Sequence, residues 1–231
     1  YSNYGTIRNI VVNLTECSKV QNNNIFLIGS YNYGTLENFI IHNSVPLYGN
    51  SGLTMGFENN YGTIKNGYIY GEDIEIKGKL LTNDRNVGGL VIGSSSRGLI
   101  KNIYSLIKIN FETQDSSKNE GVGNIIKTNA AEVQNIYSVE SGNTIDFNHG
   151  PSIAYNTGKV SNAYYFSEQL FNNNYNSKTT RLALYDGTFQ NQMLNAEEKF
   201  AIEELLKMEY YPQLIMPECM PNQTYISLPE I

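Results

Sequence analysis

The sequence has few of the residues on which metal and covalent chemistry usually depend. Its 231 residues include two cysteines, two histidines and no tryptophan. Cys17 and Cys219 lie near opposite ends without metal-site spacing, so we expect two buried thiols, with a disulfide between them as the alternative. His42 and His149 lack the His-Glu-x-x-His spacing of a zinc peptidase, and we expect each to be a solvated or hydrogen-bonded turn residue. The sequence therefore predicts no metal site and no cofactor.

Charged residues are also scarce, at 16% of the chain, and 22 Asp and Glu outnumber 16 Lys and Arg. The formal net charge of -6 argues against nucleic acid and anionic membranes as partners. No stretch approaches the ~20 apolar residues of a membrane span, so we expect no direct membrane insertion. The chain begins with Tyr-Ser-Asn and shows no charged n-region with an apolar h-region, so we expect a piece of a longer protein.

Glycine, tyrosine and a repeated motif are abundant instead. The strong copies are Asn-Tyr-Gly-Thr-Ile-Arg-Asn at 3–9, Asn-Tyr-Gly-Thr-Leu-Glu-Asn at 32–38 and Asn-Tyr-Gly-Thr-Ile-Lys-Asn at 60–66. Degenerate copies follow at 96–102, 129–135 and 156–162. A unit of about thirty residues that recurs in this way is typical of a repeat architecture.

Each copy lies between short runs of β-branched and aromatic residues that show no helical period. The runs before the copies cover 25–29, 52–57, 88–93, 122–126 and 152–155. Three short strands in about thirty residues suit one coil of a parallel β-helix, whereas a propeller blade needs four strands and about forty residues. We therefore predict an all-β fold, a right-handed parallel β-helix (solenoid) of about five to six coils over residues 1–170, with the usual hand of parallel crossovers.

The closing Asn recurs in every copy, which indicates a backbone requirement. Asn adopts the left-handed conformation of a corner between strands at lower cost than a β-branched residue. At the ~4.8 Å strand spacing, the stacked amides should hydrogen-bond in a ladder. Its members are Asn9, Asn38, Asn66, Asn102, Asn135 and Asn162. Two positions earlier an aliphatic row should point inward, and the motif Gly, replaced once by Ala131, should stand where a Cβ would crowd the next coil.

Tyrosines form two further columns in the repeat. The column two residues after the closing Asn could be a buried stack or an exposed ladder, because a turn residue can reverse the faces of the strand. We expect the exposed ladder, which is a candidate surface for stacking on a host glycan or protein. Its tyrosines are Tyr68, Tyr104, Tyr137 and Tyr164. Just before the motif Gly, a second column contains Tyr4, Tyr33 and Tyr61. The alternative is structural, because stacked tyrosines also stabilise neighbouring coils by cross-strand contact. Positions one and three after the closing Asn are expected in the core.

The segment 171–231 differs from the repeats. Residues 172–178 are polar and predict a loop. Asn195 is a suitable N-cap, and Phe200, Ile202 and Leu205 give a helical stripe that ends near residue 208. Four prolines make 211–231 an extended strap. We expect this segment to cap the open strand edges of the solenoid or to link it to a following domain.

The motif Asn-Tyr-Gly-Thr-Ile-Lys-Asn, preceded by Gly-Leu-Thr-Met-Gly at 52–56 or Gly-Gly-Leu-Val-Ile-Gly at 88–93, resembles the GLUG-type repeats of bacterial surface proteins. The chain is most similar to the non-catalytic β-helical region upstream of the protease domain in Gram-positive zinc metallopeptidases of the immunoglobulin A protease type. Tyr-Tyr-Pro-Gln-Leu at 210–214 and Met-Pro-Glu-Cys-Met-Pro at 216–221 resemble the segment that follows their repeats. The resemblance implies an extracellular or wall-associated setting and no peptidase activity in this chain.

Parallel β-helices also host polysaccharide lyases and hydrolases, which need clustered carboxylates. The densest acidic spot here, Glu72, Asp73 and Glu75, is typical of a solvated strand edge. We therefore expect no enzyme but a scaffold or binding module of a larger secreted or surface-anchored bacterial protein, as an accessory region of a metallopeptidase. An adhesin domain that binds a host protein or glycan is the alternative, and a lyase or hydrolase is a weaker one. Other domains of the same chain are further expected partners.

Overall fold

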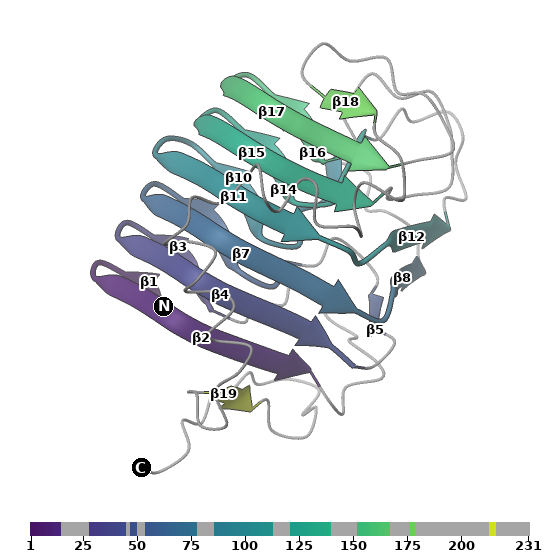
Figure 1. The fold of residues 1–231 in the computed structure, drawn as a ribbon, viewed down its shortest axis with the longest axis horizontal. Helices are drawn as coiled ribbons and strands as arrows, with labels where there is room; N and C mark the ends of the chain where they lie inside the picture. The colour runs from purple at the N-terminus through teal and green to yellow at the C-terminus, as the bar shows by residue number, and fades with distance from the viewer. Residues whose placement is uncertain are drawn as a thin grey trace.

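The computed structural model describes residues 1–14, 28–44, 47–49, 54–77, 86–112, 121–139, 152–166, 176–178 and 213–215. These residues form an all-β parallel β-solenoid (Figure 1), as the repeat predicts. Each repeat contributes one short strand and one long strand, and we call such a pair a coil. Coil one lies at the purple end of the stack in Figure 1 and coil six at its green end.

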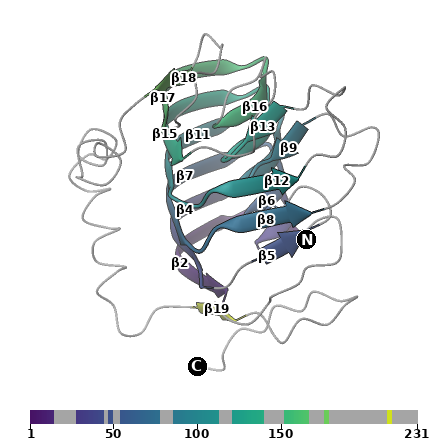
Figure 2. The same ribbon diagram turned by 90° about the vertical axis from the view of Figure 1, so that its right-hand side faces the viewer.

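Two parallel sheets run along the stack on opposite sides (Figure 2). The short strands are β1 (Ser2–Asn3), β3 (Gly29–Asn32), β6 (Phe57–Asn60), β10 (Ile92–Ser95), β14 (Ile126–Asn129) and β16 (Ile153–Asn156). The long strands are β2 (Thr6–Leu14), β4 (Thr35–Asn43), β7 (Thr63–Gly71), β11 (Leu99–Ser105), β15 (Glu132–Val139) and β17 (Lys159–Phe166). Equivalent motif residues pair between coils, for example Ile7 with Leu36 and Leu36 with Ile64.

Two smaller sheets complete the described part of the fold. A three-stranded sheet joins β5 (Leu47–Gly49), β8 (Ile74–Lys77) and β12 (Ile109–Glu112), the third strands of coils two to four. A two-stranded sheet joins β9 (Asn86–Gly88) and β13 (Gly121–Gly123), which precede the short strands of coils four and five.

The short strands begin later than the sequence predicts. Strands β6 and β14 start at the last residue of the predicted runs 52–57 and 122–126, and each ends on the first Asn of the motif. The next two residues turn the corner, and the long strand then continues through the closing Asn. The closing Asn is therefore a left-handed bend inside the long strand, with φ from +53° to +57° in the six coils, and the predicted corner between strands at that position is wrong.

The bend explains which side chains enter the core. In a regular strand, residues three apart point to opposite faces. With one left-handed residue between them, Ile100 and Ile103 both lie in the core, and neither is exposed. The aliphatic row is buried in the inner coils and partly buried in the end coils, at Ile7, Leu36, Ile64, Ile100, Val133 and Val160. The core thus runs between the two large sheets as one continuous cluster.

Both outer long strands pair with segments from beyond residue 170. Strand β18 (Asn176–Lys178) pairs with β17, so the predicted loop over 172–178 is wrong at its last three residues. Strand β19 (Gln213–Ile215) lies in the predicted strap and pairs with β2 at Val11, Val12 and Asn13. Open backbone groups at a sheet edge attract such strands. The helix predicted to end near residue 208 lies outside the described residues, and the described residues contain no helix.

Candidate binding surface

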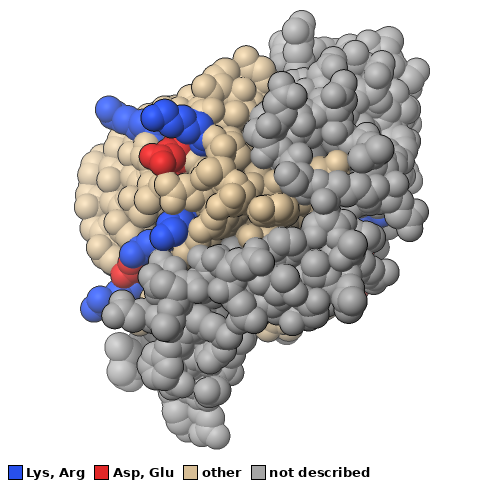
Figure 3. Space-filling view, turned by 45° about the horizontal axis from the view of Figure 1, so that its top comes forward, with Lys and Arg blue, Asp and Glu red and all other residues tan. Residues whose placement is uncertain are grey.

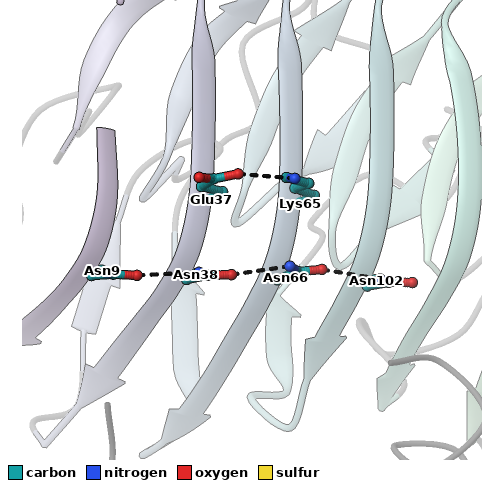
Figure 4. Close-up of polar contacts among 6 residues, drawn as sticks. All are labelled: Asn9, Glu37, Asn38, Lys65, Asn66 and Asn102. Carbon is teal, nitrogen blue, oxygen red and sulfur yellow. Dashed lines mark hydrogen bonds and ion pairs between the residues drawn. The ribbon is translucent and has the colours of Figure 1, made fainter. Parts of the chain in front are cut away.

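The closing asparagines form one hydrogen-bonded ladder through all six coils. Each side-chain Nδ2 donates to Oδ1 of the Asn in the preceding coil, at distances from 2.9 to 3.1 Å (Figure 4). The order is the predicted one: Asn9, Asn38, Asn66, Asn102, Asn135 and Asn162. Each of the four inner Asn side chains donates one hydrogen bond and accepts one within the ladder. The row therefore joins the coils to one another and is a structural element.

A second ladder lies at the corner, and the sequence reasoning assigned it no role. The first Asn of the motif donates to its equivalent in the next coil, from Asn3 to Asn32 and from Asn32 to Asn60, each at 2.8 Å. Asn129 likewise donates to Asn156 at 2.7 Å. These bonds run toward the C-terminus, opposite to those of the closing asparagines. The recurrence of this Asn at the start of five copies was the signal that could have predicted the ladder.

The glycine beside this corner has no room for a side chain. A Cβ at Gly34 would overlap the carbonyl oxygen of Gly5, and a Cβ at Gly62 would overlap that of Gly34. Gly158 has the same relation to Ala131. A Cβ at Gly5, in the first coil, would meet nothing within 4 Å. The predicted reason for the glycine column is confirmed at Gly34, Gly62, Gly98 and Gly158, whereas Ala131 shows that coil five accommodates a Cβ in the same column.

The corner of coil four is one residue longer than that of coil three. Two residues separate Asn60 from Thr63. Their register partners in coil four, Ser95 and Leu99, are separated by three. The longer path ends at Gly98, whose φ of +96° favours glycine.

The tyrosines at the corner are stacked; Tyr4 and Tyr33 are exposed, and Tyr61 is partly buried. The rings of Tyr4 and Tyr33 lie 5.0 Å apart with planes 6° from parallel, and those of Tyr33 and Tyr61 lie 5.0 Å apart at 7°. Tyr31, on the adjacent short strand, stacks on Tyr33 at 6.3 Å. Tyr4 is 77% exposed and Tyr33 is 43% exposed. We call Tyr4, Tyr33 and Tyr61 the corner tyrosines.

Arg97 extends the corner tyrosines into coil four. Its guanidinium carbon lies 5.5 Å from the centroid of the Tyr61 ring, within the range of a cation–π contact. Desolvation raises the pKa of Tyr33, neighbouring phenols raise it further, and Arg97 opposes them. Arg97 is exposed, and it makes no ion pair within the part of the chain that the structure describes. The result is a row of three aromatic rings that ends in a cation.

The column two residues after the closing Asn is not the exposed surface that the sequence predicts. Tyr104 is 3% exposed and Tyr137 is 2% exposed, while Tyr68 and Tyr164 are half-buried. The rings follow one another through coils three to six, with centroids 5.2 to 6.0 Å apart. Because each ring covers part of the next, the column shields itself from water. Burial and the neighbouring Tyr164 raise the pKa of Tyr137 above its ordinary range.

Charged residues of both signs form one row across the long strands of coils one to four: Arg8, Glu37, Lys65 and Lys101. The Lys65 ammonium lies 2.9 Å from the Glu37 carboxylate (Figure 4). Figure 3 shows Lys and Arg side chains beside acidic ones along one side of the described surface. In the predicted acidic spot, Asp73 accepts a hydrogen bond from the backbone N–H of Lys108 at 2.8 Å, which ties two coils together. Among the described residues, no group of three His, Cys, Asp or Glu could hold a metal ion.

His42 is the histidine that lies within the described residues, and it packs in a strand where the sequence predicts a turn residue. His42 lies in β4, and its ring stacks on Tyr70 with centroids 4.4 Å apart. Its Nδ1 lies 3.4 Å from the Ser44 hydroxyl. His149, Cys17 and Cys219 lie outside the described residues.

Comparisons with known protein-family models, curated proteins and solved structures find no match for this chain. In the part of the sequence that the structure describes, no helix is long and apolar enough to cross a membrane.

Proposed function

We propose that this chain is a non-catalytic scaffold module of a larger secreted or surface-anchored bacterial protein, as an accessory region of a metallopeptidase. The observation that carries the proposal is the closing-Asn ladder, which continues without a break through six coils. Hydrogen bonds along the stack add to backbone pairing at each coil, and such a stack resists bending between neighbouring repeats. The motif resemblance supports the extracellular setting and the peptidase partner.

An adhesive module is the second candidate function, and the corner tyrosines favour it. A soluble protein has no structural need to expose large aromatic side chains in a row. Tyr68, Tyr104, Tyr137 and Tyr164 no longer support this candidate, because the column is buried or half-buried.

The coding sequence around this chain provides the first test. A downstream His-Glu-x-x-His domain would support the accessory role, whereas a wall-sorting signal without a peptidase domain would favour the adhesin. Antibodies against the chain should label intact cells of the source bacterium. Labelling only after cell lysis would contradict the surface assignment.

Activity assays test the non-catalytic part of the proposal. The purified chain should release no peptide from immunoglobulin and no unsaturated product from acidic polysaccharides. Turnover that survives repurification would overturn the scaffold assignment and favour a lyase or peptidase.

A further inference from the structure

We propose that the corner tyrosines and Arg97 form a binding strip for an acidic saccharide, which lies along the solenoid axis across coils one to four. The inference depends on the adhesive role given above as the second candidate function. It moves that role from the buried tyrosine column to the coil corner.

The fold does not require tyrosine at the corner. Coils five and six have Ala130 and Thr157 at the position of Tyr33, and they form the same corner. There the backbone N–H groups of Ala130 and Thr157 donate to the preceding coil, as that of Tyr33 does. The aromatic rings are thus additional to what the corner needs for folding.

The spacing of the rings suits a chain of sugars. Centroids 5.0 Å apart exceed the ~3.5–4.0 Å contact distance between stacked carbons, so the rings are offset and each leaves part of its face uncovered. Pyranose rings have apolar C–H faces and hydroxyl edges. The faces can contact the uncovered ring margins while the hydroxyls bond to the phenol oxygens. The outer face of Tyr4, which has no ring beyond it among the described residues, offers a full platform at one end.

The charge of the strip selects an acidic sugar. The Arg97 guanidinium is exposed and free of ion pairs among the described residues, whereas Lys65 on the neighbouring sheet is paired with Glu37. A guanidinium binds a carboxylate in bidentate fashion. One cation beside the rings matches a uronic or sialic acid unit, but it is too little for nucleic acid, which needs a basic groove along its backbone.

The strip is too narrow for a stable protein partner by itself. Each tyrosine buries roughly 150–250 Å², so three rings supply less than the roughly 800 Å² per partner of a standard protein interface. A saccharide chain one sugar wide needs no more than such a row.

The test is titration of the whole 231-residue chain with oligogalacturonate, with a neutral cello-oligosaccharide in parallel. Tyr33→Thr copies the residue of coil six, so it should preserve the fold, and it should weaken oligogalacturonate binding about tenfold. Arg97→Gln should weaken binding and reduce its dependence on salt. Thermal melting of each variant shows whether the fold is retained.

Two matched substitutions outside the strip serve as controls. Tyr155→Thr removes an exposed tyrosine from coil six, and Arg8→Gln removes an exposed cation from coil one. Both should leave the affinity within about twofold of the parent chain.

The inference is overturned if oligogalacturonate does not bind at millimolar concentration, or if Tyr33→Thr and Arg97→Gln bind like their controls. Equal affinity for the neutral oligosaccharide would overturn the role of Arg97. None of these results would affect the scaffold proposal, which the activity and cell-labelling experiments address. Release of unsaturated product would contradict the scaffold proposal and leave the binding strip in place.

Discussion

Coils one to three and coils five and six form similar corners with different residues at the tip. The tip is a tyrosine in coils one to three, Ala130 in coil five and Thr157 in coil six. Coil four has a longer corner with Arg97 next to Tyr61. The left-handed Asn, in contrast, is present in every coil. The solenoid therefore requires the closing Asn in every coil but does not require a particular residue at the tip of the corner.

Tyrosine also changes place between the two halves. Two residues after the closing Asn, the first two coils have Val11 and Ile40, and the later four coils have tyrosines. Those of coils four and five, Tyr104 and Tyr137, are buried, while Tyr4 and Tyr33 at the corner of the early coils are exposed. The same residue type thus contributes to stability in one half and to a surface in the other.

Truncation of a tyrosine in each half tests this contrast most strongly. Tyr137→Ala should lower the free energy of unfolding by about 3–5 kcal/mol, because it removes a buried ring and leaves a cavity. Tyr33→Ala should lower it by less than about 1 kcal/mol, because Tyr33 is 43% exposed and coils five and six form the same corner with Ala130 and Thr157. Urea titration of both variants provides the measurement. Equal losses would mean that the corner ring is structural after all.

The ladder of closing asparagines should contribute to the free energy of unfolding in both halves, and a substitution in its middle tests this contribution best. Asn66→Ala should cost about 2–4 kcal/mol, because two ladder hydrogen bonds are lost and alanine is strained at positive φ. Asn66→Gly should cost about 1 kcal/mol less, because glycine accepts that φ. Asn9→Ala, at the end of the ladder, loses one bond and should cost less than Asn66→Ala. Identical unfolding midpoints for Asn66→Ala and Asn66→Gly would contradict the prediction that alanine is strained at this positive φ.

The glycine column contains a matched pair in the first two coils, Gly34 with a coil before it and Gly5 without one. Gly34→Ala should lower the free energy of unfolding by about 1–3 kcal/mol, because its Cβ would overlap the Gly5 carbonyl oxygen. Gly5→Ala should change it by less than about 0.5 kcal/mol, since nothing lies within 4 Å. Thermal melting can rank the two. A larger loss at Gly5 would rule out crowding between coils as the reason for the column.

The smallest effect is expected at the ion pair of coils two and three. The Lys65 and Glu37 side chains are 34% and 20% exposed, so the pair should contribute about 0.2–1 kcal/mol. A double-mutant cycle with alanine at both positions measures this coupling energy, and 1 M salt should remove most of it. A coupling that is unchanged at high salt would indicate a contact that is not electrostatic.

Much of the architecture was predictable because the repeat samples each position six times. The inward aliphatic row, the ladder of closing asparagines and the crowded glycines all follow from a residue type that recurs at one position. The pairing of β19 with β2 was foreseen only as a general capping role, because a three-residue strand such as Gln213–Ile215 has no periodicity to recognise.

The candidate surface was less predictable. Alternation left the column of Tyr104 and Tyr137 open between a buried stack and an exposed ladder, because a turn residue can reverse the faces, and the predicted exposure is wrong. Exposure depends on what neighbouring coils place beside each ring. The contact between Arg97 and Tyr61 depends on one extra residue in the corner of coil four. The sequence did not indicate this residue, because the motif copy at 96–102 is degenerate.

The sequence by itself determined the parallel solenoid, its repeat length and the positions of the left-handed asparagines, because short-range backbone preferences and a shared core act in the same way on every copy. Only the tertiary structure decided which tyrosines contact water and where the Arg97 guanidinium lies. Those outcomes depend on packing between side chains that are about thirty residues apart in sequence and one strand spacing apart in space.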